Sequence, residues 1–313
     1  MKPPQKTLVV LVGATGVGKT ALGIKLAQHL DTEIISADSR QVFREMNVGT
    51  AKPKPKEMQG IVHHFVDSHS ITENFTVADF EKQALAVLEK IFEKKNVALV
   101  VGGSGLYVKV LCEGLDEMPE TDPEIREKIQ QQFDNQGLES LLEQLQVLDP
   151  VYARQVDTRN PQRIIRALEV CLSTGLPYSA FRTGKKTVRP FNILKIGINR
   201  PRPVLYQRID DRMDLMLAAG LVEEAKSLYE FRHKNALQTV GYHEVFDFLE
   251  GKYDESEMIR LLKRNSRRYA KRQMTWFNKD LATVWFEAEE EEKILHFIEN
   301  HFINSYPWVQ SST

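Results

Sequence analysis

The sequence has few of the features that mark secreted, metal-binding or membrane proteins. Only two cysteines, Cys112 and Cys171, occur among its 313 residues, too few for a disulfide framework or a zinc site with the usual ligand spacing. Both lie in apolar surroundings, so we expect small core residues in a reducing compartment. Residues 1–6 lead into an apolar segment without a signal-peptide pattern, and no apolar run reaches transmembrane length. These absences favour a cytoplasmic protein that does not enter a membrane.

The chain also lacks an excess of charge of either sign. Its formal net charge is −1, so the overall charge indicates no partner. Hydrophobic residues make up 42% and charged residues 27%, which are ordinary values for a globular protein. The length suffices for two domains, or for one large domain with an insertion.

One glycine-rich segment, residues 13–20, matches the phosphate-binding pattern G-x-x-x-x-G-K-[ST] of the P-loop. An apolar, β-branched stretch precedes it and an amphipathic stretch follows, which is the strand–loop–helix context that the motif requires. Backbone N–H groups of such a loop surround phosphate oxygens at the positive end of a helix. By itself the loop suggests a nucleotide such as ATP. Its residues are Gly13, Ala14, Thr15, Gly16, Val17, Gly18, Lys19 and Thr20.

The first third of the chain alternates between strand and helix patterns. Strands are predicted at residues 7–12, 33–36, 61–66 and 97–101, and helices at 20–30 and 77–94, the latter with Thr76 as N-cap and Asp79 in its first turn. Repeated strand–helix units predict a parallel sheet with helices on both faces. We therefore expect an α/β fold like that of the P-loop NTPases.

Strand patterns disappear between residues 116 and 189. Asp122-Pro123 and Asn160-Pro161 are helix-start signals, and Gly137 and Gly175 are stop signals. This segment is predicted to be a helical insertion in a core formed by residues 1–115 and 190–313. In the second part of that core we expect a strand at 191–198, helices at 205–219, 222–233, 242–249 and 255–278, a short strand at 283–286 and a last helix from 289.

An acid is missing where many P-loop enzymes need one. Hydrolysing ATPases end a buried strand in an acid that holds Mg²⁺, but the strand at 97–101 runs into Gly102-Gly103-Ser104-Gly105. The guanine-specificity pattern Asn-Lys-x-Asp is absent too. A motor or a GTP switch is therefore disfavoured, and a small-molecule kinase or another group transferase remains.

Two polar residues follow predicted strands on the edge of the sheet where ligands bind. Asp38 comes after the second strand and could act as a general base or orient a metal-bound water; a purely structural Asx-turn is an equal alternative. The Ser104 hydroxyl could donate a hydrogen bond to a ligand from the glycine-rich segment that follows the strand. A tight turn without a ligand would have the same sequence. His63-His64 has no partner at metal-ligand spacing and is interpreted as a packed or hydrogen-bonded pair.

Residues 260–279 carry eight lysines and arginines and no acid. Arg260, Arg264, Arg268 and Arg272 recur at i, i+4, with Lys263, Arg267 and Lys271 beside them. Leu262, Tyr269 and Trp276 are predicted to form the opposite apolar seam. The pattern indicates a polyanion-binding helix. The alternative is an exposed helix paired with the acidic run at 289–292. Arg163 and Arg166 form a smaller basic pair at i, i+3 on the helix that starts at Asn160-Pro161, and the alternative for this pair is a solvated basic face.

Nine blocks, in order, resemble the tRNA dimethylallyltransferases (tRNA isopentenyltransferases) along almost the whole chain. They are residues 13–20, 38–42, 49–53, 63–64 with Asp67, 76–80, 102–107, 160–170, 240–244 and 268–277. Members of this family move a dimethylallyl group from dimethylallyl diphosphate to N6 of the adenosine just 3′ of the tRNA anticodon. The zinc finger of the eukaryotic members is absent from this sequence, so the resemblance is to a bacterial-type enzyme. We expect it to be a cytoplasmic monomer.

The resemblance implies a role for each matching residue. The P-loop would cradle the diphosphate, Lys19 would neutralise it, and Thr20 would ligate Mg²⁺. Asp38 would accept the N6 proton, and Ser104, where a threonine is common, would keep the hydroxyl. The residues implied to contact the anticodon stem-loop of tRNA are Asp38, Ser39, Arg40, Gln41, Arg126, Gln162, Arg163, Ile164, Ile165 and Arg166. Weaker candidates for diphosphate or tRNA contacts are Arg208, Arg212, Arg268 and Arg272.

Three alternatives remain at this stage. A small-molecule or nucleoside kinase of the same fold class would phosphorylate with ATP and would not bind RNA. A non-enzymatic RNA-binding protein would use the P-loop only as a ligand sensor. Plant-type relatives prenylate free adenine nucleotides, but the basic helix and the helical insertion favour tRNA as the acceptor.

Overall fold

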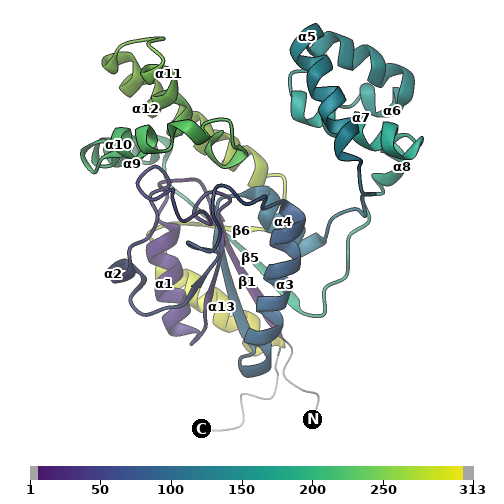
Figure 1. Ribbon diagram of the computed structural model, residues 1–313. Coiled ribbons are helices and arrows are strands. Elements are labelled where there is room, and N and C mark those ends of the chain that lie inside the picture. The colour runs from purple at the N-terminus through teal and green to yellow at the C-terminus, as the bar shows by residue number, and fades with distance from the viewer. Residues whose placement is uncertain (1–5, 306–313) are drawn as a thin grey trace, which may run out of the picture. The chain divides into compact units, whose positions relative to one another are not determined.

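The computed structural model describes residues 6–305 and contains one parallel sheet (Figure 1). Its strand order is β3-β2-β4-β1-β5-β6, and every pairing is parallel. The predicted P-loop-type α/β fold is confirmed. The strands are β1 (Thr7–Gly13), β2 (Ile34–Ala37), β3 (His63–His64), β4 (Val97–Gly102), β5 (Asn192–Asn199) and β6 (Val284–Glu287).

Helices follow the strands, and three of them begin at a residue that the sequence predicts as a cap. Thr76 accepts a hydrogen bond from the Asp79 N–H, and Asp122 and Asn160 cap their helices in the same way. Gly137, at φ 77°, interrupts α5. The helices of the described part are α1 (Lys19–His29), α2 (Pro55–Met58), α3 (Val77–Lys94), α4 (Gly105–Glu113), α5 (Pro123–Leu148), α6 (Pro150–Ala153), α7 (Pro161–Thr174), α8 (Tyr178–Phe181), α9 (Arg202–Ala218), α10 (Leu221–Ser227), α11 (Tyr242–Leu249), α12 (Glu255–Phe277) and α13 (Glu291–Ser305), with short 3₁₀ turns η1 (Tyr229–Phe231) and η2 (Asn235–Leu237).

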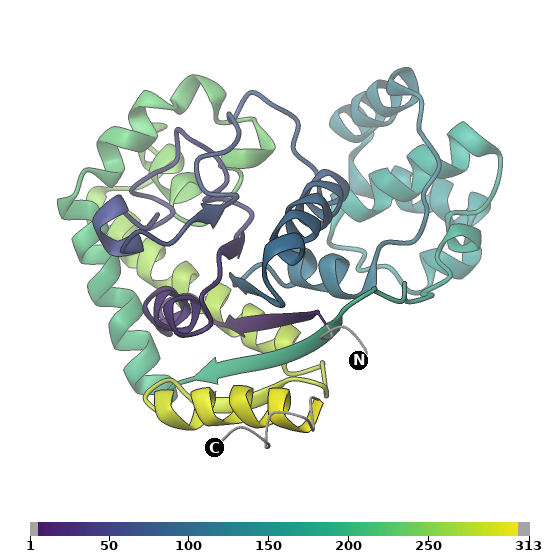
Figure 2. The ribbon, with the colours of Figure 1, turned by 90° about the horizontal axis from the view of Figure 1, so that it is seen from below.

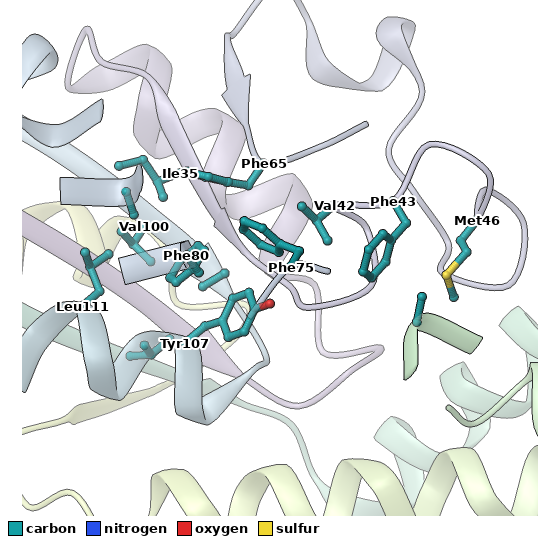
Figure 3. Close-up of a cluster of buried hydrophobic side chains, with 14 of the residues drawn as sticks. Ile35, Val42, Phe43, Met46, Phe65, Phe75, Phe80, Val100, Tyr107 and Leu111 are labelled. Carbon is teal, nitrogen blue, oxygen red and sulfur yellow. The ribbon is translucent and has the colours of Figure 1, made fainter. Parts of the chain in front are cut away.

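Both faces of the sheet are buried around β1, which explains why residues 8–12 of this strand are all apolar. Leu8 and Val10 pack into one cluster together with residues of α3 and α4. Val9 and Leu11 pack into a second cluster with residues of α1 and α13. Figure 2 shows β1 in purple beside the green arrow of β5, with α13 in yellow covering this face. In the first cluster the Tyr107 ring stacks on Phe80, with ring centroids 4.2 Å apart (Figure 3).

Two predicted elements are shorter in the structure. The strand expected at 61–66 reduces to His63–His64, because Phe65 and Asp67 adopt positive φ angles of 62° and 54° that end extended pairing. The helix expected at 222–233 ends with α10 at Ser227 and continues only as the 3₁₀ turn η1. The histidines make hydrogen bonds at the sheet edge, His63 with the Ile61 carbonyl and His64 with Glu33.

The chain divides into two compact units, Met1–Glu113 with Arg189–Thr313, and Gly114–Val188. The second unit has a core of its own, formed by apolar residues of α5, α6 and α7 with Tyr178 of α8. In the first unit the Arg189 guanidinium donates to the carbonyls of Val110 (2.6 Å) and Leu111 (2.9 Å), so the chain leaves and re-enters this unit at neighbouring points. The expected direct entry of residues 1–6 into β1 falls mostly on residues 1–5, which lie outside the described part. Between residues 6 and 305, no helix has the length and apolar character needed to cross a bilayer.

Candidate functional site

A cleft opens at the carboxyl edge of the sheet, where parallel strands place their following loops together. It contains about 670 Å³ of space, including its open mouth. The P-loop, the segment after β2 and the helices α9 and α12 contribute its walls. The residues that line it are Thr15, Asp38, Arg40, Gly49, Thr50, Ala51, Ile209, Arg212, Met213, Met216, Thr239, Val240, Gly241, Ser266 and Tyr269.

The P-loop joins β1 to α1 as the sequence predicts, with Gly18 as the residue before the helix at φ 118°. The Lys19 ammonium turns into the loop and donates to the carbonyls of Gly13 (3.0 Å) and Ala14 (2.8 Å). Burial lowers the pKa of Lys19 to about 8; the Asp38 carboxylate opposes this shift and Arg212 adds to it. The side chain of Thr20 is exposed, and its hydroxyl has no recorded partner among residues 6–305. It is therefore available to a ligand.

Three arginines donate hydrogen bonds to the P-loop. Arg212 donates to the Thr15 hydroxyl at 2.6 Å and Arg208 to the Gly16 carbonyl at 3.0 Å. Arg200 donates to the Val17 carbonyl at 2.7 Å. The contacts of Arg208 and Arg200 thus use two carbonyls of the loop. Burial lowers the pKa of Arg212, which Asp38 opposes.

Sequence analysis named Arg208 and Arg212 only as weaker candidates and missed Arg200. A signal for Arg200 existed, because it directly follows β5 on the same sheet edge as the P-loop.

Asp38 forms the Asx-turn that was one of the two alternatives at its sequence position, and it also lines the cleft. Its Oδ1 accepts hydrogen bonds from the backbone N–H groups of Arg40 (2.9 Å) and Gln41 (3.3 Å), which is an Asx-turn. Its Oδ2 has no recorded hydrogen bond within the described part, and the residue lines the cleft. The turn therefore fixes the carboxylate through one oxygen and leaves the other for a ligand.

The neighbours of Asp38 are held by the surrounding loops. The Ser104 hydroxyl accepts from the Ser39 N–H at 2.9 Å and lies 3.2 Å from the Ser39 hydroxyl, so the structure places Ser104 against the Asp38 turn. Arg40 lines the cleft and donates to the Asn235 carbonyl at 2.8 Å. Gln41 donates to the Thr50 carbonyl at 3.1 Å.

Gln273 of α12 was missed by sequence analysis. This buried side chain accepts from the Thr15 N–H at 2.8 Å and donates to the Gly103 carbonyl at 2.9 Å. It thereby ties the P-loop to the exit of β4. Gly102, in the position without an acid, lies so close to Ala37 that a Cβ would come within 2.2 Å of the Ala37 carbonyl oxygen. Close strand packing thus leaves no room for an acid there.

The basic helix differs from its prediction in two respects. Lys263 and Arg267 pair with Asp214 and Asp210 of α9, so part of the predicted stripe is neutralised within the molecule. Tyr269 lines the cleft rather than an apolar seam, and burial raises the pKa of its phenol to about 12.

The remaining residues of α12 separate into exposed and buried sides. Trp276, which was also assigned to the apolar seam, is 40% exposed. Arg260 pairs with Glu257 of its own helix. Arg268 and Arg272 are exposed and have no acidic partner in the described part of the chain. The helix buries Met258, Leu262, Ala270 and Phe277 instead.

In the second unit, Arg126 and Arg166 converge on Glu169, whose side chain is 2% exposed, at 3.4 and 3.1 Å. Gln162 and Arg163 are exposed on α7. Ile164 and Ile165, which the resemblance implies as tRNA contacts, have their side chains in the core of this unit. Only their backbone remains for such a contact. Within residues 6–305, no group of three or more His, Cys, Asp or Glu side chains could hold a metal ion.

Known proteins similar to this chain share both its sequence and its fold. A sequence profile of the IPP transferase family matches residues 41–280. The tRNA dimethylallyltransferase of Cytophaga hutchinsonii is 52% identical over 94% of this chain and 97% of its own length; that of Christiangramia forsetii is 49% identical over 94% and 97%.

Two solved structures share the fold over nearly the whole chain. The tRNA isopentenylpyrophosphate transferase of Bacillus halodurans has a TM-score of 0.72 and 37% identity over 96% of this chain and 98% of that protein. A eukaryotic dimethylallyltransferase acting on tRNA has a TM-score of 0.81 and 27% identity over 98% and 81%.

Proposed function

The chain belongs to the IPP transferase family of tRNA dimethylallyltransferases, and we propose that it transfers a dimethylallyl group from dimethylallyl diphosphate to N6 of the adenosine 3′ of the anticodon. The observation that carries this assignment is the position of Asp38 on a cleft shared with Thr15 of the P-loop and Arg212. A base for the acceptor and a cation for the leaving group thus line one cavity.

The donor diphosphate is assigned to the P-loop. Lys19, Arg212 and the N–H groups at the start of α1 supply positive charge where the allylic C–O bond breaks and its electrons move to the diphosphate. The loop suits this leaving group as well as it suits a nucleotide.

Mg²⁺ fits the same place. Thr20 offers an exposed hydroxyl without a recorded protein partner at the start of α1, and one protein ligand is enough where phosphates and water complete the coordination of Mg²⁺. When bound, the ion would neutralise charge on the diphosphate. Thr20 would hold it next to Lys19.

The acceptor adenine is assigned to the Asp38 side of the cleft. The N6 nitrogen attacks the allylic C1, the new C–N bond replaces the C1–O bond, and the N6 proton passes to Asp38 Oδ2. A base must leave its stack to be reached in this way. The exposed Arg268 and Arg272 of α12, and the arginines of α7, are suited to the phosphate backbone of the anticodon stem-loop. We assign the reaction to a monomer in the cytoplasm.

A direct assay tests the proposal. The protein is incubated with unmodified tRNA, Mg²⁺ and labelled dimethylallyl diphosphate, and nucleosides from the digested tRNA are examined by mass spectrometry. The expected product is N6-dimethylallyladenosine at the position 3′ of the anticodon. Incubation with labelled ATP in place of the donor is the control, and phosphorylation without prenylation would overturn the proposal.

Substituting Asp38 separates chemistry from binding. Because the carboxylate accepts the proton, Asp38→Ala should lower kcat by at least about 100-fold, the range of a general base. The Kd for tRNA should change much less. Equal losses in both quantities would reassign Asp38 to positioning.

A further inference from the structure

One wall of the cleft is an irregular segment held by an unusual concentration of hydrogen bonds. Residues 47–51, named here the 47–51 loop, contribute Gly49, Thr50 and Ala51 to the lining. Ala51 has a φ of 47°, in the left-handed region that a non-glycine residue occupies at a cost. The loop therefore needs external support to keep its shape.

Glu224 of α10 provides that support. Its Oε2 accepts from the backbone N–H groups of Asn47 (2.9 Å) and Val48 (2.8 Å), and its Oε1 accepts from that of Gly49 (2.9 Å). Three consecutive donors of the loop thus meet one carboxylate. Hydrogen bonds to a charged acceptor are stronger than those between neutral groups.

Tyr242 of α11 completes the arrangement. Its side chain is fully buried, and its hydroxyl donates to Glu224 Oε1 at 2.6 Å. A Cβ on Gly49 would come within 2.5 Å of the Tyr242 ring, so the ring packs against the loop backbone where only glycine fits. In addition, Gln41 of the Asp38 turn donates to the Thr50 carbonyl. The loop is thus fixed between α10, α11 and the Asp38 turn.

We propose that Glu224 and Tyr242 are positioning residues for the transfer reaction, which hold the 47–51 loop as the wall against which the acceptor adenosine is placed beside Asp38. The inference rests on the proposed function, since it takes the Asp38 side of the cleft as the acceptor site. No recorded hydrogen bond within residues 6–305 joins Glu224 or Tyr242 to the P-loop.

The test is the effect of Glu224→Gln on the two substrates separately. The substitution keeps one side-chain oxygen, removes the charge, and replaces the second acceptor by an NH₂ group that opposes the loop N–H donors. We expect kcat/KM for tRNA to fall about tenfold or more, while KM for dimethylallyl diphosphate stays within about twofold of the wild type. Glu223→Gln is the matched control, because Glu223 is its exposed neighbour on α10.

Tyr242→Phe is a second, milder variant, which serves as the test if Glu224→Gln does not fold. It keeps the buried ring and removes only the hydroxyl. It should lower kcat/KM for tRNA by a smaller factor. The double variant should be no worse than Glu224→Gln alone, since both act through one carboxylate. Equal values for Glu224→Gln and Glu223→Gln, or a parallel loss for donor and tRNA, would overturn the inference. Failure of the proposed function is distinct, because the wild type itself would then transfer no dimethylallyl group.

Discussion

At the scale of single residues, the site depends on a few side chains whose surroundings change their chemistry. Lys19 lies inside the P-loop and donates to the carbonyls of Gly13 and Ala14. A diphosphate would replace these weak neutral acceptors by charged oxygens. Because burial lowers the pKa of Lys19 to about 8, its charge before the donor binds depends on pH near the physiological range.

The pH dependence of donor capture follows from that shift. Lys19 is a cation below a pH of about 8 and neutral above it, and only the cation attracts the diphosphate. We expect the alkaline limb of the pH profile of kcat/KM for dimethylallyl diphosphate to be level up to this pH. Above it, kcat/KM should fall about tenfold per pH unit. In Lys19→Arg the alkaline fall should disappear, since arginine stays charged. A wild-type profile that remains level to about pH 9.5 would contradict this assignment.

Gln273 is a second residue whose substitution should have a measurable effect, in this case on the free energy of unfolding. In Gln273→Leu, the Thr15 N–H and the Gly103 carbonyl lose the buried side chain that joins them. We expect the free energy of unfolding to fall by about 2 kcal/mol or more. Thr275→Ala, on the exposed side of the same helix, should change it by less than about 0.5 kcal/mol. Denaturant unfolding of both variants measures the difference, and similar midpoints would show that the bridge contributes little.

At the scale of elements, α12 has two kinds of cation. Lys263 and Arg267 face acids of α9, whereas Arg268 and Arg272 point to solvent without an acidic partner in the described residues. Only the second kind is available to RNA phosphates. Helix α12 therefore forms ion pairs with α9 through Lys263 and Arg267 and exposes Arg268 and Arg272 to solvent.

The salt dependence of tRNA binding distinguishes these rows. Arg268→Gln and Arg272→Gln should each reduce the slope of log Kd against log salt by about 0.7–0.9, the contribution of one phosphate contact. Lys263→Gln and Arg267→Gln should leave the slope unchanged, because their charges are already paired. Filter-binding titrations over a range of salt concentrations measure all four. Equal slopes in the two pairs would mean that the ion pairs with α9 do not decide which cations contact RNA.

At the scale of the whole molecule, the two units have separate cores. The two clusters on the faces of the sheet contain residues of the first unit only, and the third cluster lies entirely within Gly114–Val188. The hydrogen bonds of Arg189 to the end of α4 bring the two connections of the insertion together. We therefore expect the first unit to keep its structure without the second.

A replacement tests this separation. When residues 114–188 are exchanged for a short Gly/Ser linker, the remaining core should fold and bind inorganic diphosphate as the full chain does. Its affinity for tRNA should fall by at least about tenfold, since several phosphate contacts are lost. Calorimetric titration with each ligand measures both. The control is the full chain with Arg126, Arg163 and Arg166 changed to glutamine. Because Arg126 and Arg166 share the single carboxylate of Glu169, the three arginines keep a net positive charge for tRNA, and this variant should show a similar loss for tRNA alone. Loss of diphosphate binding in the shortened protein would contradict the separation.

Local sequence determined much of this fold. The P-loop spacing, the apolar strands and the caps at Thr76, Asp122 and Asn160 act within a few residues of one another, so their patterns are legible in the chain. Where local conformation departs from the pattern, as at Phe65 and Asp67 after β3, the predicted strand is too long. The family resemblance, carried by ordered blocks, supplied the function that no single motif specifies.

The tertiary structure alone decided which side chains meet. Gln273 lies 258 residues from Thr15 in sequence, and Glu224 lies 175 residues from Gly49. Likewise, the acids that neutralise Lys263 and Arg267 stand on another helix. Such contacts depend on how helices pack on the sheet, and no local periodicity encodes them. The sequence therefore determined the phosphate loop and its chemistry, whereas packing decided what holds that loop, what shapes the opposite wall and which charges remain for RNA.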